Sequence, residues 1–431
     1  MDFEELKRVL FERTNFGMKL GLERMQDALQ LLGNPERCAP ALHVAGTNGK
    51  GSTCAFAEAS LRAAGLRTGL YTSPHLNHFC ERIRLDGQPI SESSAAALLE
   101  TLLAKVPWAL RDDGLTFFEL ATLLAFLAFA EARVDVMVIE VGLGGRLDAT
   151  NVLEKPAACA VAALGLEHTQ HLGPTLSHIA REKAGIFKAG SPAVSAGQPL
   201  EAAQLLQRRA DSLHTMLWRP GRDYAFESRP ERAFCYQGPE WTVRPERLSL
   251  PGHHQRGNAA LACALLEAAR LPGVTAAHAA QGLASAVWPA RLEQVLKDVY
   301  VDGAHNPHAA AALARALPEL LQGRPLRLVF GALQDKDAAA MLHELGPLAA
   351  SVHYCAPDTP RALAPEVLEH VWPGQIHDGV PQALAAARAE GGVVLCCGSL
   401  YLAGEARAAL LGQALAPMPA DPLFASSTGR K

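Results

Sequence analysis

The sequence predicts an α/β fold in two domains, each built on a mainly parallel sheet. Short apolar segments alternate with helical patterns along most of the chain, which is typical of parallel sheets covered by helices. The chain has 431 residues, too many for one ordinary hydrophobic core. A glycine-rich loop lies between an apolar segment and a helical one, so the first domain is expected to bind phosphate.

The glycine-rich loop occupies residues 43–53 (HVAGTNGKGST). The apolar segment 41–45 is expected to be a buried strand leading into the loop, and the segment 54–65 a helix leading out of it. Glycines let backbone N–H groups face an anion without a Cβ in the way, and a helix N-terminus adds a favourable dipole. Lys50 adds a positive charge. The segment therefore predicts a loop that holds phosphate groups.

The spacing of this loop departs from the standard pattern G-x-x-x-x-G-K-[ST]. Val44 stands where that pattern has its first glycine, and Gly51 stands where it has a hydroxyl residue. Hydroxyls follow at Ser52 and Thr53. A glycine-rich turn with a purely structural role is the alternative. The combination of strand, helix and lysine favours phosphate binding.

Composition argues against several other classes of protein. A formal net charge of -4 with mixed signs gives no reason to expect a nucleic-acid partner. The nine cysteines include no C-x-x-C pair, and Cys396 and Cys397 are adjacent, so on a strand they point to opposite faces. We therefore expect no zinc site, and reduced thiols in a cytoplasmic protein.

A membrane segment is not expected either. The first residues are acidic and lack the apolar core of a signal peptide. The most apolar helical pattern, 117–132, contains Glu119, Thr122 and Glu131, and it is shorter than the roughly 20 residues that span a bilayer. This segment is expected to be a buried helix.

Helical patterns flank the phosphate loop on both sides. Residues 2–32 have a helical pattern interrupted at Gly17 and Gly21. Farther along the chain, residues 91–104 predict another helix, for which Ser91 is the expected N-cap.

Polar side chains stand at the ends of predicted strands, where open α/β sheets bind ligands. Ser73 follows the strand predicted at 67–72, and His168 follows the one predicted at 157–164. A histidine by itself is more often a surface or capping residue than a ligand. Because these strand ends meet beside one phosphate loop, His168 becomes a candidate ligand.

The nearly all-apolar segment 134–141 predicts a central parallel strand. Glu140 lies near its carboxyl end, where a buried carboxylate is costly unless it binds a metal or pairs with a cation. An ion pair with Lys50 is one alternative, and magnesium beside the phosphate loop is the one we favour. The glycine-rich loop 142–151 that follows is expected to close over a substrate.

The middle of the chain changes in composition. Residues 179–188 predict a helix containing Lys183, which by itself reads as an ordinary solvated lysine. From about 200 to 250, arginines and chain-breaking prolines and glycines separate short β-like segments, which predicts a small β appendage. An alanine-rich helix is then expected to begin near residue 252.

A domain boundary is expected near residue 288. Residues 1–288 are expected to form the phosphate-binding domain, and residues 289–431 a smaller Rossmann-like α/β domain with a tail, after about residue 415, that frays. Asp302 again stands at a strand end. The strands predicted in this second domain are 299–302, 326–331, 351–355 and 393–397.

Taken together, the motifs resemble those of the folylpolyglutamate synthase/dihydrofolate synthase family, a branch of the Mur ligase superfamily, over nearly the whole chain. The resemblance implies a P-loop-containing Mur-ligase-type central domain and a smaller Rossmann-like C-terminal domain. It rests on segments 20–25 (LGLERM), 46–52 (GTNGKGS), 72–76 (TSPHL), 116–119 (TFFE), 140–151 (EVGLGGRLDATN), His168, 181–187 (REKAGIF), 258–260 (NAA), Arg291 and 301–307 (VDGAHNP).

The resemblance also implies roles for individual residues. The ATP phosphates would be held by Gly49, Lys50, Gly51 and Ser52, and the rest of ATP would be contacted by Asn258, Arg291 and Asp302. One magnesium ion would be bound by Ser73 and Glu140, and a second by His168 and by Lys183 carboxylated with carbon dioxide. The residues implied to be catalytic are Lys50, Glu140, His168 and Lys183. The pteroate end of the substrate would contact Thr116, Phe117, Phe118, Glu119, Leu147, Asp148 and Ala149. One departure is Ala290, where the family commonly has glycine.

The implied reaction joins L-glutamate to dihydropteroate or to a folate at the expense of ATP, in a monomeric cytoplasmic enzyme. Activation of the carboxylate as an acyl phosphate requires a phosphate cradle, metals and the exclusion of water, and it requires no serine or cysteine nucleophile. We expect a bifunctional enzyme, with a dedicated folylpolyglutamate synthase as the first alternative. A cell-wall amino-acid ligase would need a site for a uridine diphosphate sugar and would lack the 147–149 signature. A non-catalytic nucleotide-binding protein is the remaining alternative.

Overall fold

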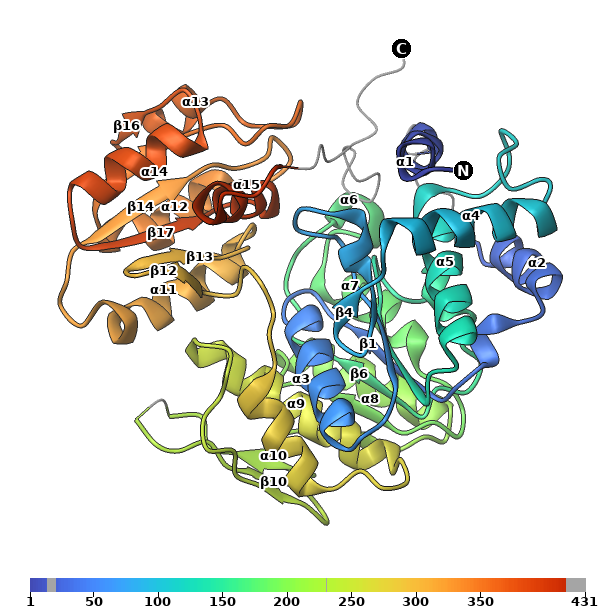
Figure 1. The fold of residues 1–431 in the computed structure, drawn as a ribbon. Helices are drawn as coiled ribbons and strands as arrows, with labels where there is room; N and C mark the ends of the chain where they lie inside the picture. The colour runs from blue at the N-terminus through green and yellow to red at the C-terminus, as the bar shows by residue number, and fades with distance from the viewer. Residues whose placement is uncertain (14–20, 230, 416–431) are drawn as a thin grey trace.

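The computed structural model describes residues 1–13, 21–229 and 231–415. Figure 1 shows a larger body, coloured from blue to yellow, and a smaller orange-to-red body beside it. The expected interruption at Gly17, the first residue of the 20–25 motif and the tail after residue 415 lie outside the described residues. The two bodies contain separate sheets, as the alternating pattern predicts.

The larger sheet has eight strands in the order β4-β3-β2-β5-β1-β6-β7-β8. Strands β2, β5, β1, β6, β7 and β8 are parallel to one another. Strands β3 and β4 continue the sheet beyond β2 in antiparallel pairs. Parallel strands end at a common edge, so the loops after β1, β2, β5 and β6 meet there. The strands are β1 (Ala41–Ala45), β2 (Thr68–Tyr71), β3 (Ile83–Leu85), β4 (Gln88–Pro89), β5 (Val136–Glu140), β6 (Ala158–Val161), β7 (Ala193–Ser195) and β8 (Leu217–Trp218).

Helices cover both faces of this sheet. In the central strand β5, Val136 and Val138 pack with the helices of one face, and Met137 and Ile139 with those of the other. The first face is covered by α3 (Lys50–Ala63), α9 (His253–Ala269) and α10 (Ala276–Ser285). The opposite side carries α1 (Phe3–Glu12), α2 (Glu23–Leu32), α4 (Glu92–Lys105), α5 (Phe117–Ala132), α6 (Thr169–Leu172), α7 (Leu176–Lys183) and α8 (Leu200–Ser212).

The β appendage is smaller than the sequence predicts. Helix α8 and strand β8 lie within the expected range 200–250, but both belong to the main domain, because β8 pairs with β7 and α8 packs in its core. The separate sheet is three antiparallel strands in the order β11-β10-β9. These are β9 (Ala225–Phe226), β10 (Tyr236–Gln237) and β11 (Thr242–Val243), drawn at the bottom of Figure 1.

The smaller sheet has six strands in the order β12-β13-β17-β14-β15-β16, parallel except for the β12–β13 pair. Its strands are β12 (Glu293–Leu296), β13 (Val299–Val301), β14 (Leu326–Phe330), β15 (Ala349–Tyr354), β16 (Gln375–Ile376) and β17 (Val393–Cys397). Its helices are α11 (Pro307–Leu321), α12 (Ala338–Leu345), α13 (Pro365–Val371), α14 (Val380–Ala389) and α15 (Leu400–Leu411). The last strand of the first sheet along the chain is β8, and the first strand of the second sheet is β12. We therefore propose a domain boundary shortly before β12, which gives domains 1–288 and 289–431.

The main error in the predicted helices concerns α3, which begins at Lys50 and not at residue 54. Gly49 takes the left-handed conformation (φ 88°) at the N-cap, so Lys50, Gly51 and Ser52 form the first helical turn. A glycine adopts this conformation without strain. The phosphate loop is therefore shorter than the sequence suggests, and its lysine lies on the helix.

Other local predictions are confirmed. The side chain of Ser91 caps α4 by accepting from the Ser94 backbone N–H, and α5 has the predicted bounds and is buried. All nine cysteines are free. Among the described residues, no helix is both long and apolar enough to cross a membrane.

The contact between α10 and α3 gives a test of this packing. A Cβ on Gly282 would lie 2.3 Å from the backbone nitrogen of Ser60, whereas a Cβ on Gly257 in α9 meets nothing within 4 Å. We expect Gly282→Ala to lower the free energy of unfolding by about 1–3 kcal/mol, because overpacking outweighs the gain in helix propensity. Gly257→Ala should raise it by up to about 1 kcal/mol. Urea unfolding of both variants checks this, and equal effects would contradict the packing.

Candidate functional site

One cavity of about 270 Å³ lies between the two domains, against the phosphate loop. The N-terminal domain lines it with Thr47 through Ser52, and with residues after β2, β5 and β6. The C-terminal domain lines it with residues after β13 and from the start of α11. The predicted residues that line it are Gly49, Lys50, Gly51, Ser52, Ser73, Glu140, His168, Asn258, Arg291 and Asp302.

The phosphate loop is shaped by close packing. A Cβ on Gly49 would lie 2.2 Å from Oδ1 of Asn258, and one on Gly51 would lie 2.8 Å from Nε1 of Trp288. The backbone N–H groups of Thr47 and Asn48 both donate to the Ala163 carbonyl, at 3.0 and 3.1 Å. This carbonyl follows β6, so the loop is fixed to the next strand of the sheet.

Two side chains of α9 contact the start of α3. Gln255 is fully buried, and its Nε2 donates to Oγ of Ser52 at 3.2 Å. Its Oε1 accepts from Nδ2 of Asn258 at 2.9 Å. The sequence pattern predicts no role in the site for Gln255, although this residue lies three positions before Asn258, on the same helix face.

Glu140 is buried at the carboxyl end of β5. Burial raises the pKa of its carboxyl group, and the nearby charge of Lys50 lowers that pKa by less. Its Oε2 accepts from the Ser73 backbone N–H at 3.3 Å. Lys50 Nζ donates to the Thr47 carbonyl at 3.1 Å, and no ion pair found within the described residues joins it to Glu140. The ion-pair alternative is therefore wrong for this structure.

His168 and Lys183 come together on the other side of the loop. Burial lowers the pKa of His168 to about 3, so its ring is neutral at pH 7. Burial, with the nearby charge of Lys50, lowers the pKa of Lys183 to about 7. Lys183 Nζ donates to the Gly46 carbonyl at 2.8 Å. Its interpretation as a solvated lysine is therefore wrong, because the side chain turns inward onto the phosphate loop.

These four side chains fit divalent cations. Oγ of Ser73 is buried with no hydrogen-bond partner, beside the buried carboxylate of Glu140, and both are oxygen ligands of the kind magnesium prefers. A neutral histidine ring is also a metal ligand. Within the described residues, no group of three or more His, Cys, Asp and Glu side chains is placed to hold a metal. A cation here would thus depend on Ser73 and on Lys183 as well.

Arg291 and Asp302 face the cavity from the C-terminal domain. Asp302 accepts from the backbone N–H groups of Leu292 and Ala304, at 2.7 and 2.8 Å, and so ties the linker to the end of β13. Arg291 Nη1 donates to the Ala290 carbonyl at 2.8 Å. Ala290 takes the left-handed conformation (φ 54°), which a glycine would adopt without strain.

The predicted pteroate-binding segment at the start of α5 lies outside the residues found to line this cavity. Thr116 and Glu119 form a capping box, and Glu119 also pairs with Arg24 at 2.9 Å. Phe117 packs edge-on against Phe79, and Phe118 against Tyr71. Both rings are core side chains.

The loop after β5 is packed against the end of α7, so the structure does not support its closing over a substrate. The Arg146 backbone N–H donates to the Glu182 carbonyl at 2.8 Å. Asp148 accepts from the backbone N–H groups of Leu143 and Thr150 at 2.8 and 3.0 Å, and also from the Thr150 hydroxyl. Its oxygens therefore hold the loop together. Leu147 is half-buried and Ala149 buried beside it.

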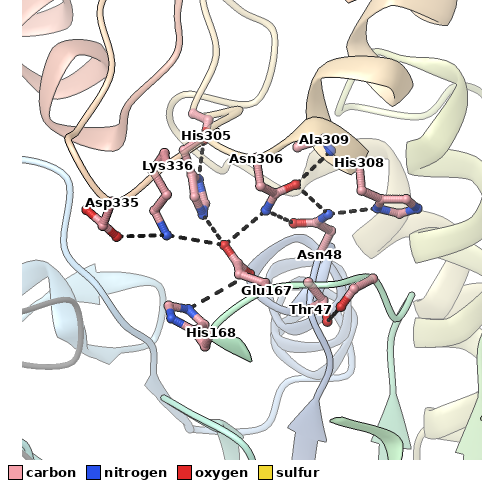
Figure 2. A network of polar contacts seen from close by, with 12 residues as sticks. Thr47, Asn48, Glu167, His168, His305, Asn306, His308, Ala309, Asp335 and Lys336 are labelled. Carbon is pink, nitrogen blue, oxygen red and sulfur yellow. Dashed lines mark hydrogen bonds and ion pairs between the residues drawn. The ribbon is translucent and has the colours of Figure 1, made fainter. Parts of the chain in front are cut away.

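A polar network joins the two domains at the rim of the cavity (Figure 2). Oε1 of Glu167, in the loop after β6, accepts from Asn306 at 3.0 Å, lies 3.1 Å from Nε2 of His305 and lies 3.6 Å from Nζ of Lys336. Burial alone would raise the pKa of Glu167, but the His305 hydrogen bond and the neighbouring charges hold it well below its usual range. The sequence pattern does not single out any of these residues, although His305 and Asn306 lie in the 301–307 motif.

The comparisons with known proteins agree with this geometry. Residues 290–400 match the family model of the Mur ligase, glutamate ligase domain. The chain is 37% identical over 428 residues to dihydrofolate synthase/folylpolyglutamate synthase of Bacillus subtilis, covering 94% of this chain and 98% of that protein. It is 40% identical over 389 residues to the Escherichia coli protein of that name, covering 89% of each.

Another relative is about twice as long. The chain is 39% identical over 426 residues to a probable bifunctional folylpolyglutamate synthase/dihydropteroate synthase of Halobacterium salinarum, and it spans 51% of that protein.

Solved structures give the same result. Escherichia coli FolC in complex with DHPP and ADP matches with a TM-score of 0.86 at 35% identity, over 94% of this chain and 96% of that chain. A Mycobacterium tuberculosis folylpolyglutamate synthase complexed with ADP and AMPPCP matches with a TM-score of 0.84 at 33% identity, over 90% and 95%. The fold is thus of the Mur ligase type, and the chain belongs to the dihydrofolate synthase/folylpolyglutamate synthase family.

Proposed function

We propose that this protein is an ATP-dependent ligase that joins L-glutamate to dihydropteroate and to folates through an acyl phosphate. One observation carries the proposal: a phosphate loop and a buried carboxylate with an unpartnered hydroxyl line one cavity, which a second domain closes from the other side, and a buried lysine donates to the phosphate loop. Similar structures contain ADP with DHPP, or Mn, AMPPNP and L-glutamate.

The reaction has two steps. The substrate carboxylate attacks the γ-phosphorus of ATP, which forms the acyl phosphate and releases ADP. The amine of glutamate then attacks the acyl carbon, loses a proton, and phosphate leaves. In this proposal Gly49, Lys50, Gly51 and Ser52 hold the phosphates, and Asn258, Arg291 and Asp302 contact the rest of the nucleotide. Because developing charge falls on phosphate oxygens, positive charge and backbone N–H groups placed there lower the barrier.

Two magnesium ions would neutralise phosphate charge at this site. Ser73 and Glu140 are the proposed ligands of the first, since the buried Ser73 hydroxyl has no hydrogen-bond partner and lies beside the buried Glu140 carboxylate. His168 and Lys183 are the proposed ligands of the second. An ammonium ion would be repelled there, whereas carboxylation by carbon dioxide turns the lysine into an anion. With a pKa of about 7, a large share of Lys183 is the unprotonated amine that reacts with carbon dioxide.

The acceptor specificity is the finer part of the proposal. We infer a bifunctional enzyme, because its relatives in Bacillus subtilis and Escherichia coli carry both names and match most of the chain. The contacts of the pteroate end with Thr116, Phe117, Phe118, Glu119, Leu147, Asp148 and Ala149 remain predictions. A ligand that bonds Asp148 must replace one of its loop hydrogen bonds. We also propose a monomer, since one chain supplies both walls of the cavity, and a cytoplasmic location, since all nine cysteines are free.

The phosphate loop is tested by Lys50→Ala. Loss of this charge should reduce ligation by about 10²–10³-fold or more, because the lysine acts on phosphate charge that develops in the transition state. The melting temperature should stay near that of the wild type, since within the described residues the Lys50 side chain makes a single hydrogen bond, to the Thr47 carbonyl. Lys105→Ala, an exposed change on α4, is the control. Near-normal turnover of Lys50→Ala would contradict the assignment.

The carboxylation of Lys183 is tested by spectroscopy and by substitution. With ¹³C-labelled bicarbonate, the wild type should show a carbamate carbon signal that Lys183→Ala lacks. The same variant should lose most of its ligase activity, because a metal ligand is removed. Lys188→Ala is the matched control, since Lys188 is also partly buried but donates to the Asn151 carbonyl. A carbamate signal that survives in Lys183→Ala places the modification elsewhere.

The acceptor range is tested by one coupled assay of ATP hydrolysis in the presence of glutamate. Both dihydropteroate and tetrahydrofolate should stimulate hydrolysis and give amide products detectable by mass spectrometry. Turnover of tetrahydrofolate alone would identify a dedicated folylpolyglutamate synthase. ATP hydrolysis that needs neither acceptor would favour a different function for the site.

A further inference from the structure

Glu167 stands where the N-terminal domain meets the C-terminal domain. It follows β6, its side chain is only 9% exposed, and its Oε1 contacts three C-terminal-domain side chains. His305 and Asn306 follow β13, and Lys336 lies before α12. One carboxylate oxygen thus joins two segments of the C-terminal domain that are separated by α11 and β14 (Figure 2).

Two polar contacts of His305 set the orientation of its ring. Its Nδ1 lies 2.8 Å from the Gly303 carbonyl, which only accepts, and its Nε2 lies 3.1 Å from the Glu167 carboxylate. Both ring nitrogens therefore lie at hydrogen-bonding distance from an oxygen, and the position of the ring is set at both ends. Gly303 immediately follows Asp302 at the cavity, so the bond to Glu167 fixes His305 beside the nucleotide site.

A second pair of bonds connects the same segment to the phosphate loop. Nδ2 of Asn306 donates to Oδ1 of Asn48 at 3.1 Å, and Nδ2 of Asn48 donates to Oδ1 of Asn306 at 3.2 Å. The second N–H of Asn306 goes to Glu167, and Asn48 also contacts Nδ1 of His308 at 2.8 Å. Every amide hydrogen of this pair has a partner, so Glu167 completes the network that joins the phosphate loop to the second domain.

Charge explains why this position needs a carboxylate. Lys336 places positive charge near a cavity that Lys50 and Arg291 already line. Asp335 balances part of the Lys336 charge at 3.5 Å, and it also pairs with Arg361. Glu167 is a carboxylate of the N-terminal domain that faces this cation, and in a partly buried site such a pair is screened little by solvent.

We propose that Glu167 is a positioning residue for the ligation: it holds the C-terminal domain over the phosphate loop and orients His305 and Lys336 at the rim of the nucleotide cavity. This inference rests on the proposed function. Glu167 itself need not touch a substrate. Because small misplacements of reacting groups are costly, loss of this contact is expected to lower the rate of the chemical step.

The first test compares Glu167→Gln with Glu58→Gln in the full chain. Gln keeps the length of Glu167 and still accepts from Asn306, but it lacks the charge that pairs with Lys336. We expect kcat/KM for glutamate to fall by about 10²-fold, with binding of the ATP analogue AMPPNP nearly unchanged. Glu58 is the matched control, since it is a buried carboxylate bonded to Arg62 and Thr68 within one domain. Its variant should lose stability but keep kcat and KM.

The second test measures the arrangement of the domains without using activity. Spin labels on p-acetylphenylalanine at the exposed positions Leu31 and Val367 report one interdomain distance and avoid the nine cysteines. The distance distribution should broaden in Glu167→Gln and in Lys336→Met, and the double variant should be no broader than the worse single one. Unchanged distributions in both single variants would overturn the inference, as would the same broadening in Glu58→Gln.

The two tests separate the inference from the proposed function. If the wild type does not ligate glutamate but the interdomain distance distribution broadens in Glu167→Gln, the proposed function is refuted and the role of Glu167 in domain placement stands. If the wild type ligates glutamate and Glu167→Gln has normal kcat and KM, the proposed function stands and the inference about Glu167 is refuted. If Glu167→Gln does not fold, Lys336→Met decides, because Lys336 lies in a loop of the C-terminal domain and contacts the same oxygen.

Discussion

The structure depends on a phosphate loop that is packed too closely to admit side chains. Gly46 lies against Ala162 of the neighbouring strand connection, Gly49 against Asn258 of α9, and Gly51 against Trp288 of the interdomain linker. Three parts of the chain that are far apart in sequence therefore meet at one short loop. A Cβ at any of these positions would push away the sheet, helix α9 or the linker, so the loop conformation and the placement of the surrounding elements require each other.

Buried ionisable groups concentrate around this loop. Burial raises the pKa of the Glu140 carboxyl group and lowers those of His168 and Lys183 to about 3 and about 7, so each of the three is shifted toward its neutral form. A site of this kind is unfavourable for the empty protein, because buried charge is costly without a partner. Groups perturbed in this way gather where ligands bind, because a bound ion can offer a buried group a partner of opposite charge.

The domains are coupled through the same loop. Asn48, next to Gly49, pairs with Asn306 of the C-terminal domain, and Glu167 contacts His305 and Lys336 of the same domain. Movement of the second domain therefore changes the surroundings of the phosphate loop directly. Because Asp302 ties the linker to β13 through backbone hydrogen bonds, Arg291 and Asp302 move with that domain.

The sequence by itself determined the alternation of strands and helices, the phosphate loop and the strand-end positions of Ser73, Glu140 and His168, because these features follow from local patterns and from the shared edge of a parallel sheet. It also predicted the bounds of α5 and the cap of α4. Only the tertiary structure decided what side chains far apart in sequence do to each other. Lys183 lies on a helix with an ordinary pattern, and packing turns it inward onto Gly46. Asp148 uses its oxygens within its own loop, and α8 and β8 join the main domain because their partners come from other segments. Glu167 acquires its contacts only when the two domains meet, since its three partners lie more than a hundred residues away along the chain.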